Sequence, residues 1–176
     1  MIRITPLFLL ATMASLSTAT ADDSRQVTEV EIDVGIDEVW QAFTTTAGLK
    51  SWVAPVADVD FKIGGKWRAN YNPNGKLGDE TTIENTILSF DPQRMISIRP
   101  TKFPKGFPFA EVAKTTWSVF YFSPISKSRT KVTVVGLGYT DDEQSQKMRA
   151  FFTQGNKYSL DQLKKALTKK DPQTKQ

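Results

Sequence analysis

The chain has 176 residues, with 23 lysines and arginines against 19 aspartates and glutamates, and it contains no cysteine and no histidine. This length suits one domain with a sizeable hydrophobic core. The missing residue types exclude disulfides, Ser-His-Asp and Cys-His catalytic machinery, and an ordinary zinc site. Any catalysis would have to use carboxylates, lysine, arginine, tyrosine or hydroxyl groups.

Residues 1–21 have the pattern of a secretory signal peptide. Arg3 precedes an apolar stretch from Leu7 to Leu16, and Ala19-Thr20-Ala21 forms a small-x-small cleavage site. The apolar stretch is shorter than the ~20 residues that a membrane-spanning helix needs. We therefore expect cleavage after Ala21 and an exported protein, either periplasmic or secreted.

The excess of positive charge lies at the C-terminal end of the sequence. Residues 157–176 carry six lysines and two aspartates, and residues 22–156 have a net charge of −1. Such a tail either forms a solvated helix face or is attracted to an anionic surface. No basic patch is interleaved with aromatic residues, which argues against nucleic-acid binding.

The first predicted elements are one strand and two short helices. Residues 27–34 alternate apolar and polar side chains, which is typical of a strand with one buried face. After Gly35 the apolar spacing changes to i, i+3, i+4 and i+7, which predicts an amphipathic helix. A second short helix would begin near Thr46 as its N-cap and end at Pro55. The apolar residues of the two helices are Ile36, Val39, Trp40, Phe43, Leu49, Trp52 and Val53.

Strand signals dominate residues 57–137. Ala57 to Ile63 and Trp67 to Tyr71 form a predicted hairpin around Gly64-Gly65, whose return strand presents aromatic side chains on one face. Turn residues separate the strands that follow. These strands are expected at residues 81–90, 94–99, 114–123 and 129–137, which gives seven largely antiparallel strands in all.

A long helix closes the sequence. Asp141 or Asp142 is a suitable N-cap, and Glu143 lies in the first turn, where the helix dipole favours an acidic residue. One apolar stripe then continues to about Lys170, and residues 171–176 are expected to be a disordered tail. The predicted domain therefore spans residues 22–170 and has an α+β fold in which a curved antiparallel sheet wraps around the closing helix. The stripe contains Met148, Phe152, Ser159, Leu163, Ala166 and Leu167.

Five segments in this order resemble the SRPBCC superfamily, also called START-like, and within it the branch named for the activator of the heat-shock chaperone ATPase. The resemblance covers about residues 27–168. The segments are VWQAFTTTAGLKSWV, FKIGGKWRANYNPNG, ILSFDPQRMISI, RTKVTVVGLGY and GNKYSLDQLKKAL. It implies a helix-grip fold with a hydrophobic cavity between the sheet and the long helix. Members of the superfamily bind lipids, sterols, polyketides or plant hormones, and a minority are cyclases, dehydratases or hydrolases, so the fold alone does not select a function.

The closing helix departs from the family pattern at Asn156, where a bulky aromatic residue usually follows the glycine. Asn156 and Arg149 lie on the arc of the helix that should face the sheet. In one interpretation Arg149 extends to solvent and Asn156 bonds a backbone carbonyl. In the other, the two residues form the polar end of a ligand pocket, with Arg149 receiving a carboxylate or phosphate.

Aromatic residues supply the other candidate cavity positions. Either they belong to the structural core or they form the pocket wall, and in this fold the two roles overlap. Of the first two tryptophans, we expect Trp40 to be core and Trp52 to meet a ligand, so that Trp52→Ala would weaken binding and leave the fold largely intact. The candidates besides Arg149 and Asn156 are Trp52, Trp67, Tyr71, Phe107, Trp117 and Phe152.

Residues 100–114 are rich in phenylalanine, proline and lysine and are longer than a hairpin needs. Three roles are open for this loop: a packed lid, a gate for a ligand, or a contact with a membrane surface. Carboxylate pairs such as Asp58 with Asp60 and Asp79 with Glu80 are explained by solvated or capping positions, so no metal and no cofactor is expected.

Three functions are consistent with these features. The first is an exported, non-enzymatic protein that holds a small hydrophobic or amphipathic, lipid-like ligand. The second is a cyclase-like or dehydratase-like enzyme, or a hydrolase, that uses Tyr71, Arg149 or a carboxylate as acid or base. The third is a chaperone-type interaction module, against which the predicted export argues. The sequence does not indicate the oligomeric state.

Overall fold

A computed structural model describes residues 25–169, so the predicted signal peptide and C-terminal tail lie outside the described residues. No helix between residues 25 and 169 is long and apolar enough to cross a membrane. The elements in chain order are β1 (Gln26–Ile32), α1 (Ile36–Thr44), α2 (Thr46–Trp52), β2 (Val56–Val59), β3 (Lys66–Asn70), β4 (Ile83–Asp91), β5 (Met95–Lys102), the 3-10 helix η1 (Val112–Thr115), β6 (Trp117–Ser126), β7 (Arg129–Leu137) and α3 (Glu143–Thr168).

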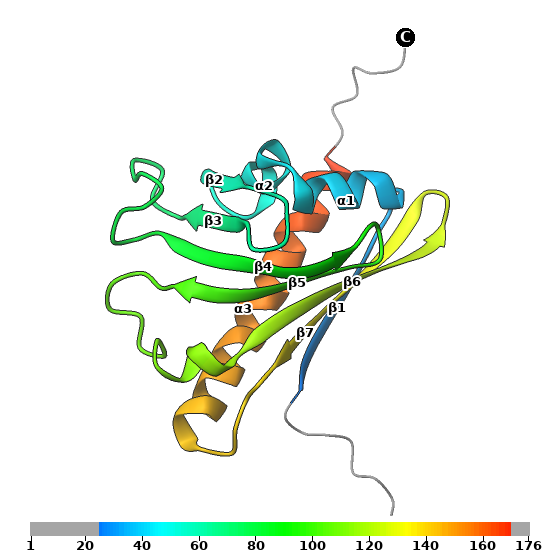
Figure 1. The fold of residues 1–176 in the computed structure, drawn as a ribbon. Coiled ribbons are helices and arrows are strands. Elements are labelled where there is room, and N and C mark those ends of the chain that lie inside the picture. Colours follow the sequence, from blue (N-terminus) through cyan, green and yellow to red (C-terminus); the bar gives the residue numbers. More distant parts are fainter. Residues whose placement is uncertain (1–24, 170–176) are drawn as a thin grey trace, which may run out of the picture.

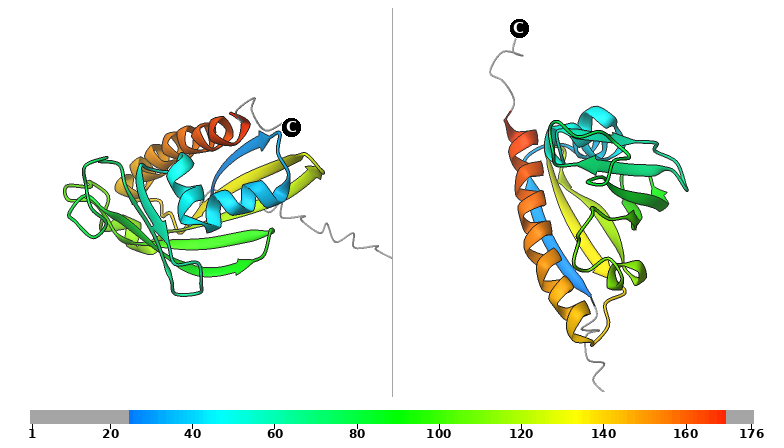
Figure 2. Two further views of the ribbon diagram at one scale, coloured as in Figure 1. Left: turned by 90° about the horizontal axis from the view of Figure 1, so that it is seen from above. Right: turned by 90° about the vertical axis from the view of Figure 1, so that its left-hand side faces the viewer.

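The seven strands form one antiparallel sheet in the order β1-β7-β6-β5-β4-β3-β2. The sheet curls, and α3 runs along its concave side beside β1, while α1 and α2 close one end (Figures 1 and 2). From β3 onward each strand pairs with its predecessor in sequence, whereas β1 pairs with β7 and lies at the opposite edge of the sheet from β2. This arrangement confirms the predicted helix-grip fold.

Helices α1 and α2 meet at Gly48, which contacts the end of α1. A Cβ atom at this position would lie 2.6 Å from Cα of Ala42, so only glycine allows this approach of the two backbones. The predicted N-cap of α2 is wrong by one residue, because Thr45 and not Thr46 caps the helix. The Thr45 hydroxyl accepts a hydrogen bond of 2.9 Å from the Gly48 N–H, and the Thr46 hydroxyl accepts one from Val59 N–H instead.

The connection between β2 and β3 is longer than the predicted Gly-Gly turn. Strand β2 ends at Val59, so Phe61 lies in a six-residue loop, although the alternating pattern placed it in the strand. The loop turns at Lys62, and its two glycines exchange hydrogen bonds with Ile87 of β4 at 2.8 and 2.9 Å. These bonds hold the loop against the sheet and direct Phe61 toward the interior.

The end of β5 and the start of β6 also differ from the predicted boundaries. Strand β5 continues to Lys102, where the Lys102 ammonium donates hydrogen bonds to the carbonyls of Gly78 and Asp79. The predicted start of the sixth strand, at residues 114–116, belongs instead to η1 and its C-cap, which Thr116 closes by donating its hydroxyl to the Ala113 carbonyl. The loop that precedes η1 is therefore shorter than the sequence indicated.

Helix α3 begins after Asp142, whose carboxylate accepts a 2.9 Å hydrogen bond from the Ser145 N–H as predicted for an N-cap. Its two ends pack in different hydrophobic clusters. Leu160 and Leu163 join the main core with the concave face of the sheet, whereas Met148 and Phe152 join a smaller cluster around Tyr139. The middle of the helix therefore lies between two cores.

The segment between β3 and β4 is organised by Asp79. Its carboxylate accepts hydrogen bonds from the N–H groups of Lys76 and Thr81, from the Thr81 hydroxyl and from the amide of the fully buried Asn70. The bonds from Lys76 and Thr81 hold the pKa of Asp79 well below its usual range. The predicted capping role of this carboxylate agrees with these contacts.

We expect Asp79→Asn to lower the melting temperature at pH 7, because the ionised carboxylate is the better acceptor for these donors. A depressed pKa contributes stability above the unfolded value of about 3.9, and that contribution is lost as the pH falls further toward the folded value. Thermal unfolding followed by circular dichroism should therefore show a difference between wild type and variant that is constant from pH 7 to pH 5. The difference should shrink below about pH 4, and a difference independent of pH would contradict this role.

Candidate functional site

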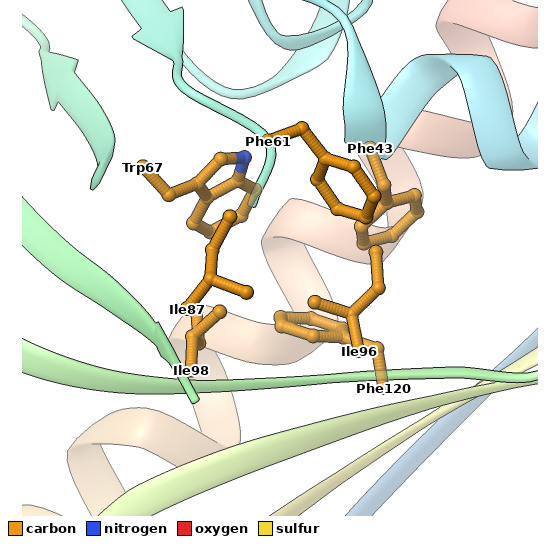
Figure 3. A pocket seen from close by; sticks show the side chains of 7 residues that line it. All are labelled: Phe43, Phe61, Trp67, Ile87, Ile96, Ile98 and Phe120. Atoms are coloured by element: carbon orange, nitrogen blue, oxygen red, sulfur yellow. The ribbon is translucent and has the colours of Figure 1, made fainter. Parts of the chain in front are cut away.

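A small apolar cavity lies between the concave face of the sheet and the elements that cover it (Figure 3). Strands β3 to β6 supply five of the lining side chains, α1 supplies one, and the β2–β3 loop supplies one. The volume is about 10 Å³, which is roughly the space that a single water molecule needs. The lining residues are Phe43, Phe61, Trp67, Ile87, Ile96, Ile98 and Phe120.

The side-chain alternation of the strands explains this wall. Ile96 and Ile98 on β5 and Phe120 on β6 face inward, and the register pairs Ile96 with Phe120 and Ile98 with Ile87. Phe43 of α1 reaches down to this layer, with its ring centroid 5.1 Å from that of Phe120. Because all of these groups are hydrocarbon, the cavity has no ionisable side chain in its wall.

Trp67 is the only predicted site residue that lines this cavity. Trp52 lies behind it, with ring centroids 6.3 Å apart, and the Trp52 indole N–H donates a 3.0 Å hydrogen bond to the Ala42 carbonyl. Trp52 is 8% exposed, whereas Trp40 is half-buried and packs edge-on against Phe61. The structure therefore places Trp52 in the core as a link between α1 and α2.

Arg149 and Asn156 lie at the junction between α3 and the start of β1. Asn156 donates a 2.8 Å hydrogen bond to the side-chain carbonyl of the buried Gln26, and the Arg149 guanidinium donates to the backbone carbonyl of Arg25. Gln26 in turn donates to the Thr28 hydroxyl at 2.6 Å. These contacts join the helix to the edge strand and do not reach the apolar cavity.

Tyr139 packs into the space left by a glycine near this junction. A Cβ atom on Gly136 would lie 3.1 Å from the Tyr139 ring and 3.2 Å from the side-chain oxygen of Gln26. Burial raises the pKa of Tyr139 to about 12, so its hydroxyl remains protonated at neutral pH. Tyr139 is therefore suited to packing and hydrogen bonding and not to proton abstraction.

Phe107 and Phe152 belong to the second cluster, at the N-terminal end of α3. Phe107 stacks on Phe103 at 5.3 Å and lies 6.2 Å from Phe152, measured between ring centroids. The residue 103–111 loop thus packs on the end of α3 remote from Leu160 and Leu163, which join the cavity's cluster. Beside it, Phe107, Phe109, Glu111 and Gln144 contribute to an open groove of about 300 Å³.

Tyr71 and Trp117 lie away from both clusters. Tyr71 follows β3 and is 59% exposed. Trp117 points to the convex face of the sheet, since Ser118 and Phe120 alternate with it, and the Arg99 guanidinium lies 5.9 Å above its ring. The structure therefore distributes the eight predicted residues over several places in the fold.

Carboxylates are used in ion pairs and turns. Asp58 forms a two-pronged hydrogen-bonded pair with Arg68 of the neighbouring strand, through Nε at 2.8 Å and Nη2 at 2.5 Å. Within residues 25–169, no three His, Cys, Asp or Glu side chains lie close enough together to hold a metal ion. The arrangement at Asp58 suits strand pairing on the outer face.

The comparisons with known proteins agree with this architecture. The sequence profile of the family described as Activator of Hsp90 ATPase homolog 1-like protein matches residues 33–168. The chain belongs to this family. No curated protein matches the chain significantly.

Solved structures similar to this chain share its fold at low sequence identity. The Aha1 dimer of Colwellia psychrerythraea is 17% identical with a TM-score of 0.64, covering 81% of this chain and 95% of that chain. A Mesorhizobium loti protein is 16% identical with a TM-score of 0.64, and the match covers 84% of this chain and 98% of that chain. Norcoclaurine synthase of Thalictrum flavum, in complex with dopamine and hydroxybenzaldehyde, is 11% identical with a TM-score of 0.60, covering 95% and 99%.

Sequence reasoning missed most of the residues that line the cavity. Phe61 was assigned to a strand, and Ile87, Ile96 and Ile98 belong to predicted strands whose inward positions were not selected. The buried Gln26 could have been found, because the alternation of Val30 and Ile32 extends back to it. The position of α1 over these strands, which creates the cavity, has no signal in the local pattern.

Because Trp52 is buried, its removal should destabilise the fold, whereas the sequence led us to expect a largely intact fold. We expect Trp52→Ala to lower the free energy of unfolding by about 3–5 kcal/mol, because a large core side chain leaves a cavity behind. Trp52→Phe should cost less, since it keeps a ring and loses the hydrogen bond to Ala42. Urea denaturation followed by circular dichroism measures both, with Trp117→Ala on the convex face as the matched control. Equal losses at Trp52 and Trp117 would contradict the core position.

Proposed function

We propose that this protein binds a small, neutral and mainly apolar molecule in the cavity beside Trp67. The observation that carries the proposal is a pocket on the concave face of the sheet, whose seven lining side chains come from five helices and strands and the β2–β3 loop and carry no charge. Ligand sites are mostly apolar and concave, with few polar groups that fix orientation. Norcoclaurine synthase, whose fold is similar, holds the ring compounds dopamine and hydroxybenzaldehyde.

The size of the cavity restricts the ligand. Sites for drug-sized molecules are about 300–1,000 Å³, whereas this one has about 10 Å³ in the closed conformation. A long lipid chain does not fit this space, so we narrow the lipid-like ligand expected from the sequence to a compact molecule. Binding requires side chains at the wall to move outward, and Phe61 is suited to this because it is half-buried on a loop.

The enzyme alternative has less support in this geometry. None of the lining residues carries an acid or base, Tyr71 is exposed, and Arg149 is bound to a backbone carbonyl at the edge of the sheet. A general acid or base has to lie within hydrogen-bond reach of the reacting group. We therefore propose binding without catalysis.

Export is a further part of the proposal and rests on the signal-peptide pattern of residues 1–21. In that case the protein would meet its ligand outside the cytoplasm. The mass of the mature chain tests this directly, because cleavage after Ala21 leaves Asp22 as the first residue.

Native mass spectrometry of the protein purified from its own host, without organic solvent, tests the binding proposal. We expect a bound neutral molecule of low mass on the wild type. Ile98→Phe should lose it, because the larger side chain fills the cavity, at a stability cost of about 1–3 kcal/mol. The matched control is Ile125→Phe on the exposed end of β6, where Ile125 is 48% exposed. A wild type that is always empty, or Ile98→Phe that retains the molecule, would refute the proposal.

A second candidate is a chaperone-like contact with another protein, as the family description suggests. One observation favours it: Phe151 is 51% exposed although its ring contacts Phe107 and Phe109 at 6.0 and 5.7 Å between centroids. An aromatic side chain kept at the surface above a hydrophobic cluster is a common contact residue.

For this second candidate, we expect the protein to slow the aggregation of reduced insulin, measured by light scattering, and Phe151→Ser to remove at least half of the effect. Tyr158→Ser is the control, because Tyr158 is 65% exposed on the same helix. If the wild type has no effect on aggregation, or if the two variants behave alike, the chaperone-like function loses its support.

A further inference from the structure

Trp67, one of the residues that line the cavity, carries a hydrogen-bond donor that has no partner in the protein and that is covered by neighbouring side chains and does not face the cavity. Among the residues that the structure describes, Nε1 of Trp67 is the one buried side-chain nitrogen or oxygen without a hydrogen bond. Figure 3 shows this nitrogen on the edge of the indole ring next to Phe61. The other lining side chains are hydrocarbons and cannot accept a hydrogen bond.

An unsatisfied buried donor is costly. Leaving such a group without a partner costs about 1–3 kcal/mol, and buried tryptophans usually find an acceptor. The neighbouring Trp52, whose ring centroid lies 6.3 Å from that of Trp67, has such an acceptor: its indole N–H donates a 3.0 Å hydrogen bond to the Ala42 carbonyl. A phenylalanine at position 67 would present a ring to the same neighbours without this cost.

Water is a poor partner for this donor. The cavity volume of about 10 Å³ is close to the minimum for one water molecule. A buried water, however, typically makes about three hydrogen bonds, and no polar atom of the protein faces this cavity. An acceptor atom attached to an apolar molecule satisfies the donor without leaving further polar groups unpaired.

We propose that the ligand carries one neutral acceptor oxygen, as in a ketone, aldehyde, ether or ester, and that this oxygen accepts a hydrogen bond from the Trp67 indole N–H. This inference rests on the proposed binding function and names the chemical class of its ligand. A carboxylate or phosphate at this end is excluded, because no cation lines the cavity and an unpaired buried charge is far more costly than a neutral polar group.

Phe61 controls the space next to this donor. Its ring packs against Trp40 and Phe90, at 5.6 and 4.6 Å between centroids, and forms the wall on the side of the Trp67 nitrogen. The residue belongs to the β2–β3 loop, whose Gly64 has a positive φ of 78°. When Phe61 moves outward, a ring-sized volume opens beside the donor, and Phe61→Ala creates this volume permanently.

Two probes of the same shape test the inference. Acetophenone carries a carbonyl oxygen where α-methylstyrene carries a methylene group, so they differ in the acceptor alone. Calorimetric titrations of the full protein would use the wild type and Phe61→Ala, each with and without Trp67→Phe. Trp67→Phe should weaken acetophenone binding about fivefold to tenfold, which is the usual contribution of one hydrogen bond. The affinity for α-methylstyrene should change by less than about twofold.

The indole N–H supplies a direct readout. In proton–nitrogen NMR spectra, the Trp67 N–H signal of Phe61→Ala should move downfield with acetophenone and much less with α-methylstyrene. Trp117→Phe is the matched control, because it removes an indole from the convex face and should leave the affinities for both probes unchanged. A purely structural role of Trp67 would shift both affinities equally and leave the N–H signal insensitive to the acceptor.

The outcomes separate this inference from the proposed function. If both probes bind and Trp67→Phe affects them equally, the acceptor inference is overturned and binding in the cavity stands. If neither probe binds the wild type or Phe61→Ala, and native mass spectra show no bound molecule, both proposals are overturned. If Trp67→Phe weakens the binding of acetophenone but not of α-methylstyrene, and the indole N–H signal shifts with acetophenone, the assigned ligand class is supported.

Discussion

The fold depends on covering one face of a curled seven-stranded sheet with very few helices. A single long helix cannot reach every inward-facing strand, and α3 packs mainly along β1. Phe43 of α1 covers much of the remaining face, with its ring centroid 4.9–5.1 Å from those of Trp52, Phe120 and Phe122. The cavity lies where this short helix meets the sheet, so the site is a consequence of how the concave face is covered.

The long helix has three sections with different chemistry. Its C-terminal part supplies Leu160 and Leu163 to the main core, and its N-terminal part supplies Met148 and Phe152 to the aromatic cluster. Between them Asn156 bonds Gln26. A Cβ atom on the neighbouring Gly155 would meet no atom within 4 Å. At this point the helix is fixed to β1 by a hydrogen bond, and Asn156 takes the place of the bulky aromatic residue that is usual in the family pattern.

Strand alternation, helix spacing and capping residues sufficed to predict the order of the main helices and strands, the antiparallel sheet and an N-cap at Asp141 or Asp142, of which the structure has Asp142, because each depends on neighbours in sequence. The candidate site was harder to predict. Trp67 was selected as an aromatic residue on one face of a predicted strand, and it lines the cavity. Trp52 was expected to meet a ligand but is buried in the core. Phe61 was expected in a strand but lies in the loop at residues 60–65, which Ile87 of a distant strand holds in place. The missing partner of the Trp67 nitrogen depends on the whole three-dimensional wall and has no counterpart in any local pattern.

The pairing of the first strand with the last has a consequence for how this chain folds. Among residues 25–169, the one strand that pairs with β1 is β7, about a hundred residues later, with Thr28 opposite Val134 and Ile32 opposite Thr130. Bringing such distant segments together costs loop-closure entropy before any contact compensates for it, which slows folding. A ribosome-bound chain that has not yet released residues 129–137 leaves β1 without its strand partner, and it also lacks α3, which follows β7 in the sequence. The domain therefore closes late and as a unit.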